Sequence, residues 1–348
     1  MLKIRQPQES KPVSPTPSHA TAAVFAACLS GCVAEHPQSI LHPVSPAAST
    51  IAWLWWAMFA VCTAVFLAVI GLLLWAVFQP ARPQRDRPPG GSTRFIVTGG
   101  IVVPWVILVG LLVYSLQASI ALRVPESDLT IRVVGHQWWW EVHYPGQGIV
   151  TANELHLPAG EPVRLELSSA DVIHSIWVPN LNGKMDLLPQ HFYGQGRPNV
   201  FWLEADQPGA WRGQCAEYCG LQHARMALEV VALSPDEFSA WVAARQRPHS
   251  EPATDVVRRG RDVFFSDQAG CQKCHTIRGT AAIARIGPDL THIAARRTLG
   301  AALLPNNRTN LAGWIADPQK FKPGNLMPRT NLGADDLEAL VAYLETLK

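Results

Sequence analysis

The sequence predicts a multi-domain membrane protein built from a two-helix transmembrane hairpin, a β-sandwich and a small all-α domain. Three patterns carry this prediction: two long uncharged apolar runs, alternating short strands after them, and a helical pattern at the carboxyl end. Of the 348 residues, 48% are hydrophobic and 16% are charged, which argues against disorder. The formal net charge of +2 comes without a long basic run, so nucleic acid is not expected as a partner.

The transmembrane hairpin is expected over residues 51–122. Residues 51–78 and residues 95–122 are each 28 residues long and contain no Asp, Glu, Lys, Arg or His. A span needs only about 20 such residues, whereas the alternative, a buried hairpin of a soluble protein, needs runs about half this long. Pro104, next to Gly99 and Gly100, is expected to kink the second helix.

The charges of the loops orient this hairpin. The connector holds one acid, Asp86, among four arginines: Arg82, Arg85, Arg87 and Arg94. Residues 12–81 contain no Lys or Arg. Because positive loops stay in the cytoplasm, both ends are expected on the periplasmic side of a bacterial inner membrane, whose lipid is then a partner.

Residues 1–31 are expected to be a signal peptide with a lipobox, followed by a linker over residues 32–50. An apolar stretch ends in Leu29-Ser30-Gly31-Cys32. This string resembles the processing site of bacterial lipoproteins, which implies lipidation of Cys32. The alternative is a processed or disordered leader with an incidental cysteine.

Residues 123–245 are expected to form the β-sandwich. Val163, Leu165 and Leu167 alternate with polar residues, and clusters of Pro and Gly separate this strand from others of the same kind. The string Ser234-Pro235-Asp236-Glu237 then supplies an N-cap, a proline for the first turn and a capping-box Glu. A short helix is therefore expected to close this domain.

A linker over residues 246–253 is expected to lead into the small all-α domain over residues 254–348. Apolar residues follow the linker at helical spacing. The net charge is −5 over residues 122–250 and +3 over residues 251–348, which favours docking of the second domain on the first. Two solvated surfaces of incidental sign are the alternative.

Five potential metal ligands lie within twelve residues: Cys215, Glu217, Cys219, His223 and Met226. Soft thiolate and thioether ligands with an imidazole select copper, and His174 on an earlier strand completes a blue-copper arrangement. The second cysteine adds the possibility that two thiolates on one loop bridge two copper ions. A disulfide is the alternative, but it leaves the histidine and methionine without a role, and zinc gains nothing from the methionine.

These strings, together with Gly135-His136-Gln137-Trp138-Trp139-Trp140 and the two spans, resemble the dinuclear CuA domain of cytochrome c oxidase subunit II over about residues 51–245. The resemblance implies a cupredoxin-like sandwich in which Cys215 and Cys219 bridge two coppers. It further implies four terminal ligands: His174, His223, Met226 and the carbonyl of Glu217. It also implies magnesium at the Glu217 carboxylate near subunit I, and electron arrival through Trp138, although core packing is the commoner use of such tryptophans.

A second constellation, Cys271-Gln272-Lys273-Cys274-His275, is typical of covalent haem attachment, with the imidazole as the proximal iron ligand. The strings Gly287-Pro288-Asp289-Leu290 and Gly324-Asn325-Leu326-Met327-Pro328 make the region from about residue 255 onward resemble a class I cytochrome c. Met327 is the expected distal ligand, and His292 is the other candidate. A thioredoxin-like interpretation lacks a βαβ context, and a zinc site lacks a fourth ligand.

A cytochrome c domain fused behind a CuA subunit resembles the caa3-type oxidases of bacteria. The resemblance implies that a cytochrome c or similar donor passes electrons to the fused haem c, then to CuA, and then to haem a in subunit I. Oxygen is reduced there at haem a3 and CuB, with proton translocation, and subunit III is a further expected partner. A CuA-bearing nitric oxide reductase and a copper or haem carrier are the alternatives.

One departure concerns proton uptake. Many subunits of this family carry a Glu near the cytoplasmic start of the second helix, whereas no acid lies between Asp86 and Glu126 here. Protons are therefore expected to enter by another group or by a different channel.

Overall fold

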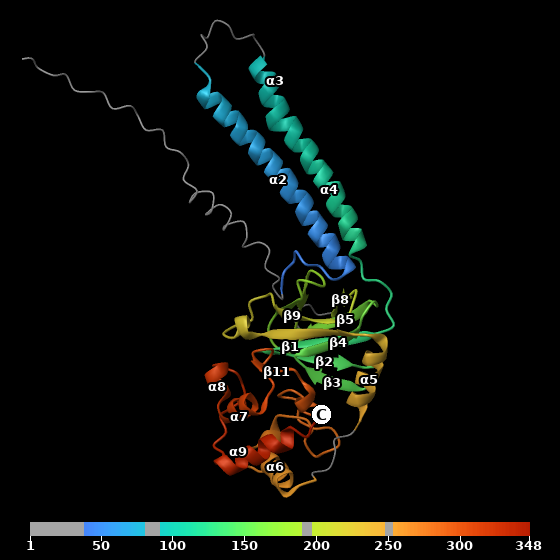
Figure 1. Cartoon of the computed structure of the whole chain (residues 1–348), viewed down its shortest axis with the longest axis vertical. Coiled ribbons are helices and arrows are strands. Elements are labelled where there is room, and N and C mark those ends of the chain that lie inside the picture. The colour runs from blue at the N-terminus through green and yellow to red at the C-terminus, as the bar shows by residue number, and fades with distance from the viewer. Residues whose placement is uncertain (1–37, 81–90, 190–196, 248–252) are drawn as a thin grey trace, which may run out of the picture. The chain divides into compact units, whose positions relative to one another are not determined.

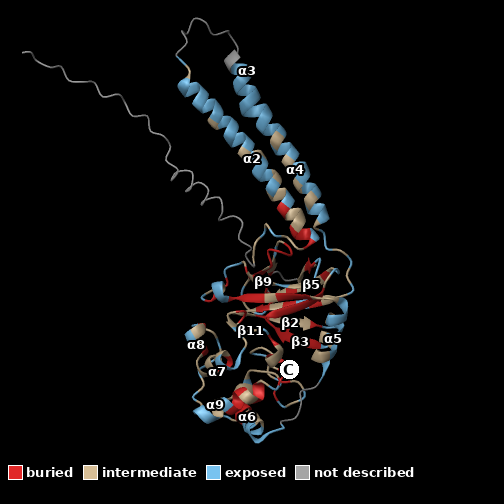
Figure 2. Cartoon of the chain, viewed as in Figure 1, coloured by how far each residue is buried: buried red, intermediate tan, exposed pale blue. Residues whose placement is uncertain are grey.

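The structure is a computed structural model that describes residues 38–80, 91–189, 197–247 and 253–348. The expected signal peptide, Cys32 and most of the arginine-rich connector lie outside these residues. The first long helix is α2 (Pro46–Phe78), and the second long helix is formed by α3 (Gly91–Val97), the π-helix η2 (Thr98–Val102) and α4 (Val103–Ala121) (Figure 1). Two segments are long and apolar enough to cross a membrane, Pro46–Phe78 and Thr93–Ala121. Figure 2 shows both mostly exposed or intermediate, except near the start of α2, where three alanines are buried.

Helix α2 begins five residues before the apolar run that predicted it. Ser45 caps it by accepting a hydrogen bond from the Ala48 amide at 3.0 Å, and Pro46 occupies its first turn. The π-helix includes Gly99 and Gly100 and ends just before Pro104. The irregularity expected in the second helix thus takes the form of a π-turn at these glycines.

Two ends of the hairpin, before α2 and after α4, are hydrogen bonded to the sandwich domain, the part of the structure over residues 123–245. The Val44 amide donates to the Asn180 carbonyl at 3.0 Å, and the Ser45 hydroxyl donates to the Leu181 carbonyl. At the other helix, Trp202 Nε1 donates to the Leu122 carbonyl at 3.2 Å. Hairpin and sandwich are therefore joined by more than the covalent chain.

The sandwich domain consists of two five-stranded sheets. The first has the order β3-β2-β1-β5-β8, with bounds Ile149–Ala152, Trp139–Tyr144, Thr130–His136, Val163–Ser169 and Asn199–Leu203. The second has the order β4-β10-β9-β6-β7, with bounds Glu154–Pro158, Ala227–Leu233, Gly209–Cys215, His174–Trp177 and Lys184–Leu187. The pairs β1·β5 and β4·β10 are parallel, and the remaining pairs are antiparallel.

The core of the sandwich follows from the alternation of its strands. In β5 every second residue from Val163 is buried, as the sequence pattern predicted. Trp140, Tyr144 and Leu165 are among the fully buried side chains. Helix α5 (Pro235–Gln246) closes the domain, and its capping box between Ser234 and Glu237 confirms the expected helix start. Two packed sheets closed by a helix confirm the β-sandwich predicted for this part.

The helical domain, residues 254–348, forms a second core around four helices among its described residues. These are α6 (Asp255–Phe265), α7 (Arg308–Ala316), α8 (Pro318–Phe321) and α9 (Ala334–Leu344). Short 3₁₀ turns, η4 (Cys271–Lys273) and η5 (Ile293–Ala295), and the small ribbon of β11 (Thr298–Leu299) and β12 (Leu304–Pro305) connect them. Phe264 and Tyr343, both fully buried, meet edge to face where α6 packs on α9.

Candidate functional site

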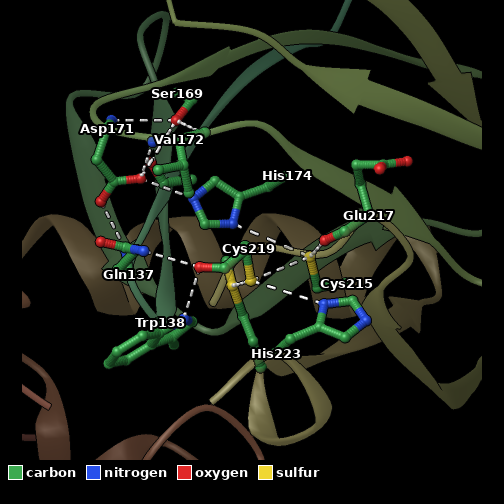
Figure 3. Close-up of polar contacts among 12 residues, drawn as sticks. Gln137, Trp138, Ser169, Asp171, Val172, His174, Cys215, Glu217, Cys219 and His223 are labelled. Carbon is green, nitrogen blue, oxygen red and sulfur yellow. Dashed lines mark hydrogen bonds and ion pairs between the residues drawn. The ribbon is translucent and has the colours of Figure 1, made fainter. Parts of the chain in front are cut away.

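The first site lies at one end of the second sheet, where sulfur and nitrogen atoms converge. The two sulfurs, Cys215 Sγ and Cys219 Sγ, lie 3.7 Å apart (Figure 3). All four other predicted ligands approach them: His174 Nδ1 at 3.9 Å and the Glu217 carbonyl at 3.1 Å from Cys215 Sγ, and His223 Nδ1 at 3.7 Å and Met226 Sδ at 3.9 Å from Cys219 Sγ. The structure therefore brings together the six groups that the sequence singled out.

Regular elements fix the two ends of this ligand loop. Cys215 ends β9, Met226 comes directly before β10, and the Cys215 amide donates to the Met226 carbonyl at 2.8 Å. His223 begins the 3₁₀ turn η3 (His223–Arg225), and His174 begins β6. The loop is thus closed by the β9·β10 ladder, and the neighbouring strand supplies the first histidine.

A hydrogen bond on the side away from the sulfurs orients the imidazole of His174. Its Nε2 donates to Asp171 Oδ1 at 2.8 Å, which leaves Nδ1 facing the sulfurs. Gly135 permits this position, because a Cβ there would lie 2.7 Å from His174 Cδ2. Burial works against a proton on this ring, but the hydrogen bonds and charges of Asp171 and Cys215 together outweigh it and raise the pKa of His174. A carboxylate that fixes the outer nitrogen is the usual arrangement behind a metal-binding histidine.

Trp138 contacts the ligand loop directly. Its Nε1 donates to the Cys219 carbonyl at 3.0 Å, and Gln137 Nε2 donates to the same oxygen at 2.8 Å. Trp140, by contrast, is fully buried in the sandwich core. The tryptophan run therefore serves two purposes, and Trp138 is the member that lies against the cysteine loop.

The donor atoms fit a soft metal ion. Among the described residues, His174, Cys215 and Cys219 are the group whose ligand atoms lie within 4.8 Å of one another. A hydrogen bond with the Cys219 thiol lowers the pKa of the Cys215 thiol to about 3, although burial opposes the shift. The same contact, together with burial, raises the pKa of the Cys219 thiol. Two sulfurs this close both ionise only when a cation lies between them, which is what copper supplies.

The expected magnesium receives no support from the described residues. The Glu217 carboxylate is exposed, and Figure 3 shows it extending away from the sulfurs, while only the carbonyl of this residue approaches Cys215. Glu217 thus contributes to the site through its backbone.

The second site is a cavity of about 210 Å³ whose wall comes mostly from the helical domain, with Trp138 and neighbouring sandwich residues completing it. Its lining includes all four residues of the predicted haem site: Cys271, Cys274, His275 and Met327. Cys271 begins the 3₁₀ turn η4 and Cys274 directly follows it, so both cysteines belong to one short wall of the cavity. Apolar side chains such as Phe264 and Leu340 form much of the remaining wall. An apolar cavity with two thiols at one edge fits a covalently attached haem.

His275 is held with one nitrogen committed. Its Nδ1 donates to the Pro288 carbonyl at 2.7 Å, and burial lowers the pKa of the ring, which favours the neutral imidazole. Gly287 lets the loop pass close by, since a Cβ there would lie 2.6 Å from His275 Cε1. Neutral imidazole with Nδ1 occupied leaves Nε2 as the ligand atom.

Met327, and not His292, lines the cavity. Both nitrogens of His292 are engaged outside it, Nδ1 with the Lys348 carbonyl at 2.7 Å and Nε2 with the Arg245 carbonyl at 2.9 Å. The Met327 amide donates to Asn325 Oδ1 at 2.8 Å, which fixes the loop that carries the thioether. Of the two candidates for the distal ligand, the structure therefore favours the methionine.

Sequence reasoning missed three residues that support these sites. Gln137 lies in the string that carries the resemblance but was given no role, and Asp171 was given none either. Lys322 has no local feature that distinguishes it from a surface lysine, although it is buried. The only sequence signal for Asp171 was its place three residues before His174.

The fold and the two sites define a membrane-anchored electron-transfer protein in which a copper-binding sandwich precedes a haem-binding cytochrome c domain. Residues 146–233 match the family "Cytochrome C oxidase subunit II, periplasmic domain", and residues 257–348 match the cytochrome c family. The chain belongs to the cytochrome c oxidase subunit II family, and its fused architecture fits the caa3 type.

The relatives agree with this assignment. Cytochrome c oxidase subunit 2 of Alkalihalophilus pseudofirmus is 35% identical over 337 residues, which cover 92% of this chain and 94% of the relative. The protein of the same name from Bacillus sp. (strain PS3) is 35% identical over 232 residues, or 64% of this chain and 63% of the relative. The solved periplasmic domain of subunit II from Bradyrhizobium japonicum is 31% identical, covers 36% of this chain and 97% of that domain, and has a TM-score of 0.33.

Proposed function

We propose that this chain receives electrons from a cytochrome c at its helical domain and passes them through the sandwich domain to subunit I of a haem-copper oxidase, where oxygen is reduced. Its membership of the oxidase subunit II family supports the destination, and the fused domain supports the order of the two steps. The chain itself is then a relay within the oxidase and does not hold the oxygen-reducing centre.

The ligand roles follow from the contacts. Cys215 and Cys219 would bridge a dinuclear CuA centre, His174 and His223 would bind through Nδ1, and the weak ligands would be Met226 Sδ and the Glu217 carbonyl. In the helical domain, Cys271 and Cys274 would hold haem c, with His275 and Met327 on its two faces. Bound in this way, both groups supply reversible one-electron transfer.

One observation carries the proposed order of transfer. Trp138 is part of the wall of the haem cavity and also donates through Nε1 to the Cys219 carbonyl at 3.0 Å. A single side chain therefore contacts both sites. This geometry supports Trp138 as the residue through which electrons reach the copper site.

The direct test is cofactor counting on the full-length protein purified from membranes. We expect two coppers with a mixed-valence near-infrared band, and one haem that acid acetone does not extract. Met226→Leu should alter the copper spectrum, whereas Met185→Leu, in a partly buried methionine on β7, should not. A single copper, or an extractable haem, contradicts the proposal.

A second test addresses the path. Trp138→Phe removes the N–H that contacts Cys219 and should slow reduction of copper after flash reduction of haem c. Trp139→Phe is the matched control, because Trp139 also lines the cavity but stacks on His136, with ring centroids 4.2 Å apart. Oxygen consumption by the assembled complex, with nitric oxide offered as a competing acceptor, identifies the terminal substrate.

Three further expectations belong to the same proposal, and the first two concern residues outside those described. They are lipidation of Cys32, a cytoplasmic position for the connector at residues 81–90, and association with subunit III. Mass spectrometry of the mature amino terminus and protease accessibility in right-side-out and inverted vesicles test the first two.

A further inference from the structure

Lys322, one residue after α8, is a buried lysine whose ammonium has an unusual set of partners. Lys322 is only 3% exposed. The ammonium donates to three carbonyl oxygens: that of Trp138 at 2.7 Å, that of Arg225 at 2.7 Å and that of Gly300 at 2.9 Å. An ammonium has three N–H donors, so all three go to carbonyl groups and none goes to a carboxylate.

These three acceptors come from different parts of the fold. Trp138 and Arg225 belong to the sandwich domain, and Arg225 directly precedes the predicted ligand Met226. Gly300 belongs to the helical domain, as Lys322 does. The ammonium is therefore satisfied only when the helical domain is seated against the sandwich, with the tryptophan and the ligand loop both in place.

Burial works against the charge of Lys322, and its three acceptors compensate for this. Burial disfavours the charged form and lowers the pKa of Lys322 to about 7. Any shift of the docked helical domain along the sandwich would leave the buried ammonium without two of its three acceptors. Because an unpartnered buried charge costs free energy, these contacts select one docked position.

Side chains of the sandwich reinforce the same junction. Gln222 Nε2 donates to the Pro323 carbonyl at 2.6 Å, and Arg225 Nη1 donates to the Phe321 carbonyl at 2.7 Å. These two carbonyls belong to the residues on either side of Lys322. The segment that carries Lys322 thus gives and receives hydrogen bonds across the junction.

The junction also lies on the path between the two sites. Lys322 and Gly300 line the haem cavity, and Trp138 donates to the Cys219 carbonyl. A short chain of hydrogen bonds therefore runs from the cavity wall through Lys322 and Trp138 to a predicted copper ligand.

We infer that Lys322 is a positioning residue that fixes the wall of the haem cavity against Trp138 and the copper-ligand loop, so that the internal electron transfer has one constant path. This inference rests on the proposed function. The role belongs to the ammonium, whose three hydrogen bonds go to none of the predicted copper or haem ligands.

The test compares Lys322→Met with Lys320→Met in the full-length purified protein. Methionine keeps most of the side-chain length and removes the ammonium, and Lys320 is an exposed lysine two residues away on α8. Lys322→Met should increase deuterium uptake in peptides covering residues 136–140 and 298–302, while Lys320→Met leaves it unchanged. Copper and haem spectra and haem content should stay at wild-type values in both variants.

A kinetic readout separates positioning from general destabilisation. In Lys322→Met, reduction of haem c by an external donor should proceed at the wild-type rate, while the haem-to-copper step slows roughly tenfold, the change expected when about 1.4 kcal/mol of docking free energy is lost. Wild-type deuterium uptake with a wild-type internal rate overturns the inference. So does an equal slowing of both steps.

Chemical labelling provides a measurement that does not depend on the variant folding. In the native wild-type protein, brief acetylation of amines followed by peptide mapping should modify Lys320 and leave Lys322 protected. Equal modification of the two lysines overturns the inference even when Lys322→Met fails to accumulate. If the wild-type protein shows this protection but no haem-to-copper transfer, the proposed function fails while the docking role of Lys322 stands.

Discussion

His174 donates through Nε2 to Asp171 Oδ1 at 2.8 Å while its Nδ1 faces the sulfur of Cys215 at 3.9 Å. The same carboxylate accepts the Gln137 amide through Oδ2 at 2.6 Å, so one side chain orients a ligand histidine and holds the chain beside Trp138. The copper site and the proposed point of electron arrival therefore share a support that belongs to neither ligand motif.

Replacing that support should weaken copper binding. In Asp171→Asn one carboxylate oxygen becomes an amide nitrogen, so the contacts to the Gln137 amide and to His174 are not all retained. Loss of such an outer partner lowers metal affinity by about 10- to 100-fold, which copper titration against a competing chelator measures. The matched control is Asp128→Asn, at an exposed position of the same domain. Equal affinities for the two variants would show that Asp171 has no orienting role.

Gly287 should be required for haem attachment. An alanine Cβ at this position would lie 2.6 Å from His275 Cε1, so Gly287→Ala must displace the imidazole or the loop that accepts its Nδ1–H. Overpacking of this kind costs about 1–3 kcal/mol of stability. We expect a lower ratio of covalent haem to protein and a lower unfolding temperature, measured by absorbance and by thermal melting.

The control for this substitution is Gly333→Ala. A Cβ at Gly333, the residue before α9, meets no atom within 4 Å. This variant should bind haem as the wild type does. A Gly287→Ala protein with full haem content and unchanged melting would contradict the packing argument.

The candidate ligand residues could be predicted from the sequence, but the residues that support them in the fold could not. Five of the predicted ligands lie on one loop between Cys215 and Met226, so their residue types indicate a copper site before any tertiary structure is known, and the family resemblance implies their individual roles. Asp171 contacts the nearby His174 but also Gln137, 34 positions away, and Lys322 and Trp138 are 184 positions apart. Nothing local distinguishes Lys322 from an exposed lysine, because its burial depends on how two domains meet.

The sheets show the same difference between local features, which the sequence predicts, and the pairing of distant strands, which it does not. The alternation in β5 predicts which face is buried, and this prediction is confirmed. Alternation says nothing about which strand lies beside β5, and its neighbours are β1, in parallel, and β8. The capping box at Ser234 was predictable because all its atoms lie within one helical turn.

Acid should destabilise the sandwich domain through His156. Burial, followed by the charges of Arg245 and Arg297, lowers the pKa of this histidine from 6.5 to about 3, and the ring stacks on Trp241 with centroids 4.5 Å apart. Between these pH values the unfolded chain binds a proton that the folded chain does not bind. Stability should therefore fall as the pH drops from about 6.5 towards 3, by up to about 1.4 kcal/mol for each pH unit.

The histidine is tested by substitution. His156→Gln should flatten the dependence of the unfolding temperature on pH in this range, measured on the detergent-solubilised full-length protein by tryptophan fluorescence. His42→Gln, at an exposed histidine, should leave the dependence as it is in the wild type. An unchanged slope in His156→Gln would mean that other groups govern the acid sensitivity.

Salt should separate delivery of electrons to this chain from their transfer within it. The contacts across the junction of the two domains are mainly hydrogen bonds to carbonyl oxygens, among them those of Lys322, Gln222 and Arg212, the last reaching the Ala302 carbonyl at 2.8 Å. The ion pair between Arg297 Nε and Glu229 Oε2, at 2.8 Å, is partly exposed and contributes at most about 1 kcal/mol.

Because hydrogen bonds at a buried junction are screened little, the haem-to-copper rate should change little between about 0.01 M and about 1 M salt. Over this range the Debye length falls from about 30 Å to about 3 Å. Reduction of haem c by an external cytochrome should slow steeply over the same range, since its encounter is guided by exposed charges. Stopped-flow mixing measures the external step and flash reduction measures the internal one; a parallel decline of the two rates would show that the helical domain leaves the sandwich between transfers.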